Sequence, residues 1–155
     1  MDFRIVALPA ATFAPLYGLP EAALAARGVR RVVADRQPGF PCRVSLRDAA
    51  PGEAVLLLNY EHQPLPGPYR SSHAIYVREH SVEQVPAVNE VPAVLATRLL
   101  SARAFDAAGM MIDADVCAGV DVAALISRYL DDARAACVHL HNARPGCYAA
   151  QAVRA

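Results

Sequence analysis

The sequence contains no lysine, because all fifteen basic residues among its 155 residues are arginines. This absence excludes a lysine Schiff base, a lysine general base and the lysine of a phosphate-binding loop. Fifteen acidic residues balance the arginines, so the formal net charge is zero. A chain without excess positive charge has no overall field to attract nucleic acid or an anionic membrane. We therefore expect no nucleic-acid partner and no membrane partner.

Long apolar runs and paired cysteines are also missing. No stretch approaches the roughly 20 apolar residues of a membrane-spanning helix. The N-terminal segment MDFRIVALPAATFAP lacks the basic region and long apolar stretch of an export signal. The four cysteines form no C-x-x-C pair, and free thiols are the expected state in a chain that is not exported. These features predict a soluble, cytoplasmic protein.

Apolar segments of strand length predominate along the chain. They predict strands at residues 3–8, 29–34, 42–46, 54–61, 72–78, 100–106, 110–116, 137–142 and 147–153. Helices are expected at residues 20–28, within residues 89–98, and after Asp121, where apolar residues recur at helical spacing. Many connections between strands are short, which favours antiparallel pairing. The prediction is a single α+β domain over residues 1–155, with a mostly antiparallel sheet and two or three packed helices.

The segment AVLLLNYEHQPLPGPYRSSHAIYVRE predicts a hairpin whose first strand is apolar until its C-terminal end. Polar and titratable side chains, including Tyr60 and His62, begin only there. If the second strand pairs back symmetrically around the Pro-rich loop, His62 lies opposite His73 and Tyr60 lies opposite Ile75. A slip of one residue would place the two histidines on opposite faces.

A second hairpin is predicted in CVHLHNARPGCYAA, residues 137–150. Side chains alternate between the two faces of a strand, so Val138 and Leu140 share the core face. His139 and His141 then share the opposite face with Cys137. We expect this histidine face to look at solvent, a cleft or a second subunit.

The Pro-Gly pair of this segment suits the middle of a type II turn. Such a turn sets His141 opposite Ala150 and His139 opposite Ala152, leaving room beside both imidazoles. The same register separates Cys137 and Cys147 by about seven strand residues, on the order of 23 Å. No disulfide is therefore expected between them.

The histidines leave several kinds of chemistry open. Two histidines in an H-x-H strand can ligate a metal from one face, and a catalytic zinc needs a third ligand, for which His62 or His73 would serve if the hairpins are neighbours. Spacing alone does not show this, so we assign no metal ligand and no cofactor. Without a metal, the same imidazoles could transfer protons. Structural, hydrogen-bonded histidines are the remaining alternative. No G-x-S-x-G and no papain-like cysteine context is present, which disfavours serine and cysteine hydrolases.

Three arginines lie beside predicted loops or turns, namely Arg43, Arg70 and Arg144. Guanidinium groups bind carboxylate and phosphate through paired hydrogen bonds, so three of them in one place could hold an anion. Scattered surface arginines are the alternative. Convergence of these loops with the histidines would favour an anion site.

The segments FPCRVSL, VLLLNYEHQP, PYRSSHAIYVRE and HLHNARPGCYAA resemble a bacterial family of short conserved proteins that carries only the label DUF1203, a domain of unknown function. The resemblance covers residues 3–153 and implies one complete domain. It implies no activity, cofactor or catalytic residue.

Together these observations favour a small-molecule enzyme acting on a small anionic substrate in one cleft. The candidate catalytic residues are His62, His73, His141 and Tyr60. The candidate substrate-binding residues are Arg43, Arg70, Arg144 and Asn142. One alternative is a non-catalytic module that binds or senses a small anion. Another is a structural domain that forms a homodimer through the histidine face of residues 137–142.

Overall fold

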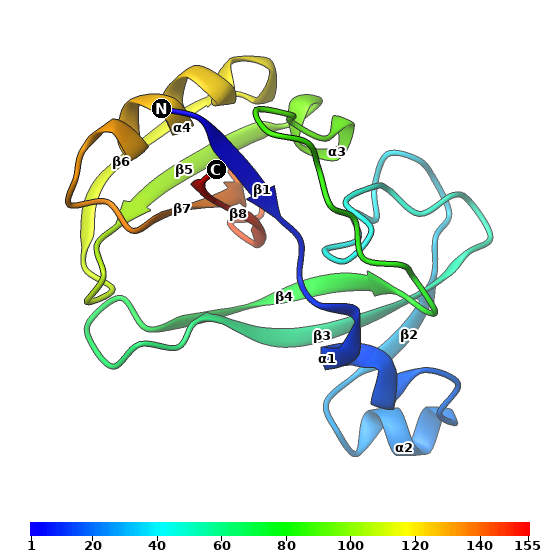
Figure 1. Cartoon of the computed structure of the whole chain (residues 1–155). Helices are drawn as coiled ribbons and strands as arrows, with labels where there is room; N and C mark the ends of the chain where they lie inside the picture. The colour runs from blue at the N-terminus through cyan, green and yellow to red at the C-terminus, as the bar shows by residue number, and fades with distance from the viewer.

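Two antiparallel β-sheets form the body of the protein, and a computed structural model describes all 155 residues (Figure 1). The five-stranded sheet has the order β1 (Phe3–Val6), β8 (Tyr148–Arg154), β7 (Cys137–Asn142), β5 (Leu99–Phe105) and β6 (Met111–Ala118). The three-stranded sheet has the order β2 (Arg30–Val33), β3 (Ala54–Gln63) and β4 (Ser71–Arg78). All neighbouring strands pair antiparallel. The predicted α+β class with mostly antiparallel sheet is confirmed.

The helices are short. They are α1 (Ala10–Phe13), α2 (Glu21–Ala25), α3 (Ala93–Ala96) and α4 (Val122–Asp131), with 3-10 turns η1 (Ala14–Leu16) and η2 (Gly119–Asp121). The three predicted helices are present, α2 is shorter than the predicted range 20–28, and α1 was not predicted. None of them has both the length and the apolar character that crossing a membrane would require.

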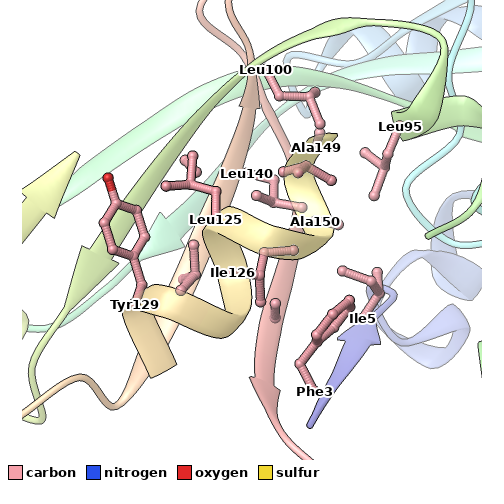
Figure 2. Packing of buried hydrophobic residues seen from close by; sticks show 14 of the residues in the cluster. Phe3, Ile5, Leu95, Leu100, Leu125, Ile126, Tyr129, Leu140, Ala149 and Ala150 are labelled. Carbon is pink, nitrogen blue, oxygen red and sulfur yellow. The ribbon is translucent and has the colours of Figure 1, made fainter. Parts of the chain in front are cut away.

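The main hydrophobic core lies between α4 and one face of the five-stranded sheet (Figure 2). Leu125 and Ile126 of α4 pack over this face, to which β7 contributes Leu140. The predicted apolar stripe of α4 is buried. Because α4 covers the Leu140 face of β7, the opposite face of the same strand is buried only if another element packs against it.

The opposite face of the five-stranded sheet packs against the three-stranded sheet. Figure 1 shows the β3–β4 hairpin on the side of the larger sheet that α4 does not cover. Ile75 of β4 packs in one cluster with Tyr148 of β8. His139 and His141 of β7 are consequently only 4% and 0% exposed. The expectation that this histidine face looks at solvent, a cleft or a second subunit is wrong, because a sheet of the same chain covers it.

The predicted register of the β3–β4 hairpin is wrong by two residues. His73 pairs with Tyr60 and Ile75 pairs with Leu58, and the register shifts between Glu61 and Gln63. The loop is not symmetric, since β3 continues to Gln63 and an irregularity absorbs one residue of that strand. A shift of two residues keeps each side chain on its face, so Tyr60 and His73 still share one face.

The predicted register of the β7–β8 hairpin is also wrong. His141 pairs with Tyr148 and His139 pairs with Gln151. The loop closes through the amide of Gly146, which donates to the carbonyl of Asn142 at 2.8 Å, so it is wider than a two-residue turn. The space beside His141 is therefore occupied by the ring of Tyr148 rather than left open by alanine. All four cysteines are free, as predicted.

Residues 42–46 do not form the predicted strand. Cys42 makes one isolated bridge to Tyr76 of β4, after which the chain turns back and the Cys42 amide donates to the Arg47 carbonyl at 3.0 Å. The amide of Leu8 donates to the carbonyl of Arg43 at 2.9 Å. This turn holds Arg43 inside the protein, where it is 2% exposed.

Candidate functional site

Four of the five histidines meet between the two sheets, and we call them the histidine cluster: His62, His73, His139 and His141. Strands β3 and β4 supply His62 and His73, whose Nε2 and Nδ1 atoms are 2.9 Å apart. Strand β7 supplies the other two, and the Nδ1 atoms of His62 and His139 are 3.4 Å apart. The two predicted hairpins are therefore neighbours.

His141 has one occupied and one free ring nitrogen. Its Nδ1 is 2.9 Å from the carbonyl oxygen of Gly146. A carbonyl oxygen only accepts, so Nδ1 carries the hydrogen and Nε2 carries a lone pair. That Nε2 is buried and has no hydrogen-bond partner. The ring lies 4.9 Å from His62 and 5.3 Å from His73, measured between centroids. A buried lone pair thus remains available within the histidine cluster.

The histidines are held in their neutral forms. Burial, with smaller contributions from neighbouring charges, lowers the pKa of His62 to about 3, of His139 to about 4 and of His141 to about 3. Burial also lowers the pKa of His73, which is half-buried. At neutral pH the imidazoles therefore offer lone pairs and no positive charge.

Aromatic rings enclose the histidine cluster. Tyr148 stacks on His62 with centroids 4.9 Å apart and rings inclined by 11°. Phe105 of β5 packs against His139 at 4.8 Å. No local sequence pattern points to these two aromatic residues, because their positions depend on register and on the pairing of β5 with β7. They help to exclude water from the histidines.

Arg103 is a cation beside the histidine cluster that no motif in the sequence indicates. It pairs with His139 across β5 and β7, and its Nε donates to the hydroxyl of Ser101 at 3.2 Å. It forms no ion pair with any carboxylate, and its positive charge contributes to the lowered pKa values of the cluster histidines. An unpaired, half-buried guanidinium at this place can stabilise negative charge on a bound group.

A cleft of about 1000 Å³ adjoins the histidine cluster, and we call it the arginine cleft. Four arginines and no acidic residue contribute to its wall, which also includes His73 and Asn142. The arginines are Arg36, Arg43, Arg98 and Arg144. Positive groups lining a concave surface concentrate the field there and attract anions. His73 is the residue that belongs to both the cleft wall and the cluster.

The four arginines differ in the hydrogen bonds and ion pairs that they already form within the protein. Arg43 donates to the carbonyls of Tyr148, at 2.8 Å, and Pro41 and to the sulfur of Cys147. Arg98 forms an ion pair with Asp48 at 2.6 Å, and Arg36 one with Asp35 at 3.1 Å. Arg144 is exposed and has no ion-pair partner. The free cation of the cleft is therefore Arg144.

Two candidate site residues lie outside both the histidine cluster and the arginine cleft. Arg70 is exposed and pairs with Glu61 at 2.5 Å. Tyr60 packs between Phe13 and Tyr148, with ring centroids 5.9 and 6.4 Å away. The structure thus brings together His62, His73 and His141, and separately gathers Arg43, Arg144 and Asn142 in the cleft wall, but leaves Arg70 and Tyr60 aside.

A family model described as "Protein of unknown function (DUF1203)" matches residues 39–154. The chain belongs to the DUF1203 family. The matched region of this DUF1203 protein contains the whole histidine cluster and three of the four cleft arginines, with Arg36 outside it. No curated protein and no solved structure matches the chain. Its function must therefore be argued from the site itself.

Proposed function

We propose that this DUF1203 protein is an enzyme that binds a small anionic substrate in the arginine cleft and acts on it with the histidine cluster. One observation carries the proposal: His73 lines the cleft and also lies 2.9 Å from His62 in the cluster. Arg144 is the group that would hold the anion, and Asn142 would orient it. Arg103 would stabilise negative charge that develops near the imidazoles.

The histidines differ in their fitness for proton transfer. A general base works best when its pKa lies near the working pH. Burial lowers the pKa of both His62 and His141 to about 3, which makes them weak bases at neutral pH. His73 is more exposed and faces the cleft, so it is the histidine suited to exchange a proton with a substrate. The buried pair is better suited to bind through its lone pairs.

The anion site is tested by titrating inorganic phosphate and a small dicarboxylate into the protein by calorimetry. Arg144→Ala should weaken binding about tenfold or more, because a hydrogen bond to a charged group contributes about 1.5–3 kcal/mol. Arg30→Ala is the matched control, since Arg30 is equally exposed but lies on β2 outside the cleft. Equal affinities for Arg144→Ala and Arg30→Ala would remove Arg144 from the site.

Catalysis is separated from binding by the variant His73→Gln. Conversion of phosphate esters and carboxylates is followed with the wild-type protein and with this variant, and the enzyme proposal predicts that binding persists while turnover is lost. A protein that binds such anions, turns none of them over and is unaffected by His73→Gln would be a non-catalytic anion-binding module.

We also propose that the protein works in the cytoplasm. Its four cysteines are free, and free thiols persist in a reducing compartment. A homodimer formed through the histidine face of β7 is disfavoured, because the three-stranded sheet of the same chain covers His139 and His141.

A further inference from the structure

Three histidine nitrogens lie close enough together to surround one metal ion. One ring nitrogen from each of His62, His73 and His141 lies within 4.8 Å of the others. Zinc–nitrogen bonds of about 2.0–2.1 Å in a tetrahedral arrangement place ligand nitrogens about 3.3–3.4 Å apart. The distance of 2.9 Å between His62 and His73 is slightly shorter than this. Ligation of one ion therefore requires His62 and His73 to move slightly apart and any pair near the 4.8 Å limit to move closer.

The buried nitrogen of His141 needs a partner that no residue provides. The side chain is 0% exposed, and its Nε2 makes no hydrogen bond. Burying an acceptor without a partner is unfavourable. Its Nδ1 side bonds the Gly146 carbonyl, and ligating histidines almost always bond a carbonyl, carboxylate or water in this way. His141 is therefore oriented as a metal ligand is.

His139 gives His62 similar support. The two Nδ1 atoms are 3.4 Å apart. If the Nδ1–H of His62 donates to the Nδ1 lone pair of His139, the Nε2 of His62 carries a lone pair that faces His73 at 2.9 Å and the hydroxyl of Ser71 at 3.3 Å. His139 is then a positioning residue rather than a ligand.

The surroundings of the three histidines favour neutral imidazole ligands. They also favour an anion as the fourth ligand of a bound metal ion. Metal binding requires an unprotonated ring nitrogen, and the Nε2 of His141 carries a lone pair because its Nδ1–H donates to the Gly146 carbonyl. Arg103 repels a cation, which counts against a bare metal ion. An anionic ligand on the metal reverses that effect, because Arg103 and the metal would both stabilise it.

We infer that His62, His73 and His141 bind one divalent transition metal ion of the zinc class and leave a coordination position for an anionic group beside the arginine cleft. Imidazole nitrogen suits zinc, copper, iron and nickel, whereas magnesium and calcium prefer oxygen. Three protein ligands with an open position are typical of catalytic zinc sites. The inference rests on the proposed function for the role of the ion and revises it at one residue, because a His73 nitrogen that ligates the ion no longer exchanges a proton with the substrate. Ion binding itself can be measured separately.

Zn²⁺ binding is tested with protein purified without a histidine tag and stripped with a chelator. Calorimetry should show one Zn²⁺ per chain, with a rise in the unfolding temperature when Zn²⁺ is added. Co²⁺ should give the strong visible absorption that is characteristic of four-coordinate sites. Absence of saturable Zn²⁺ binding to the wild-type chain would overturn the inference.

Matched histidine variants locate the ion. His73→Ala should weaken Zn²⁺ binding by at least about 100-fold and abolish the Co²⁺ absorption, whereas His139→Gln should weaken binding about tenfold, as loss of an outer partner does. His80→Asn is the control, because His80 is exposed, lies outside the cluster and has a φ of 57° that asparagine tolerates. Because His73 is half-exposed, circular dichroism should show that His73→Ala folds. Equal Zn²⁺ affinity in His73→Ala and His80→Asn would refute the site.

Measurement of phosphate binding distinguishes a failure of this inference from a failure of the proposed function. If metal-free protein binds phosphate in an Arg144-dependent way but no Zn²⁺ binds, the metal site is wrong and the anion cleft stands. If Zn²⁺ binds through the three histidines but neither form binds phosphate or a dicarboxylate, the metal site stands and the proposed function fails.

Discussion

Replacing Arg43 with alanine should lower the free energy of unfolding by about 3–4 kcal/mol, because each buried group left without a partner costs about 1–3 kcal/mol. The side chain is 2% exposed and joins the loop that follows β2 to β8. Its guanidinium donates to the carbonyls of Pro41 and Tyr148 and to the sulfur of Cys147. Alanine removes all three donors and the packing of the side chain. Urea unfolding at pH 7 measures the change.

Two further variants show how the change in the free energy of unfolding of Arg43→Ala should be interpreted. Arg43→Lys keeps the charge but cannot reproduce the planar set of donors, so an intermediate loss is expected. Arg30→Ala should change stability by no more than about 0.5 kcal/mol, as surface substitutions usually do. A fully stable Arg43→Ala protein that no longer binds phosphate would show that Arg43 serves the ligand rather than the fold.

Acidification from pH 7 to pH 5 should strongly destabilise the metal-free protein. Burial lowers the pKa of His62, His139 and His141 to about 3, 4 and 3, whereas histidine in an unfolded chain titrates near 6.5. Between these values the unfolded chain binds more protons than the folded one. The stability contributed by the neutral imidazoles is therefore complete above about pH 6.5 and is lost as the pH falls towards the folded pKa values.

The size of this effect makes it easy to measure. Each buried histidine contributes up to about 2 kcal/mol between pH 7 and pH 5, against about 5–15 kcal/mol for the whole stability of a small domain. Urea unfolding at a series of pH values should show the loss, and His139→Gln should remove one histidine's share. A flat stability profile over this range would show that the imidazoles are not buried in their neutral forms.

Local sequence patterns account for much of the fold. The alternation in CVHLHN predicts β7 with the bounds that the structure has, and helical spacing predicts the buried stripe of α4. The arrangement of the strands in two sheets is harder to predict from the sequence. Pairing of β5 with β7 joins residues about 40 positions apart, and no local pattern encodes it. The strand predicted at residues 42–46 fails because the chain turns back there, with the Cys42 amide donating to the Arg47 carbonyl and Leu46 at a φ of 47°.

The residues of the site divide in the same way. Local sequence patterns reveal some of them, and the positions of the others depend on pairing between distant segments. The titratable ends of the two predicted hairpins identify His62, His73 and His141 without the structure. Tyr148 requires the register of β7 with β8, which the wider loop shifts from the predicted one. Arg103 requires the β5–β7 pairing. Both missed residues therefore depend on interactions that only the folded chain creates.

We propose that the histidine cluster and the arginine cleft form one site. Nuclear magnetic resonance of the five imidazoles during titration with inorganic phosphate tests it most directly. The resonances of His73 should shift saturably, those of exposed His80 should remain in place, and Arg144→Ala should require about tenfold more phosphate for the same shift. Phosphate binding that leaves the His73 resonances unchanged, or moves only those of His80, would contradict the claim.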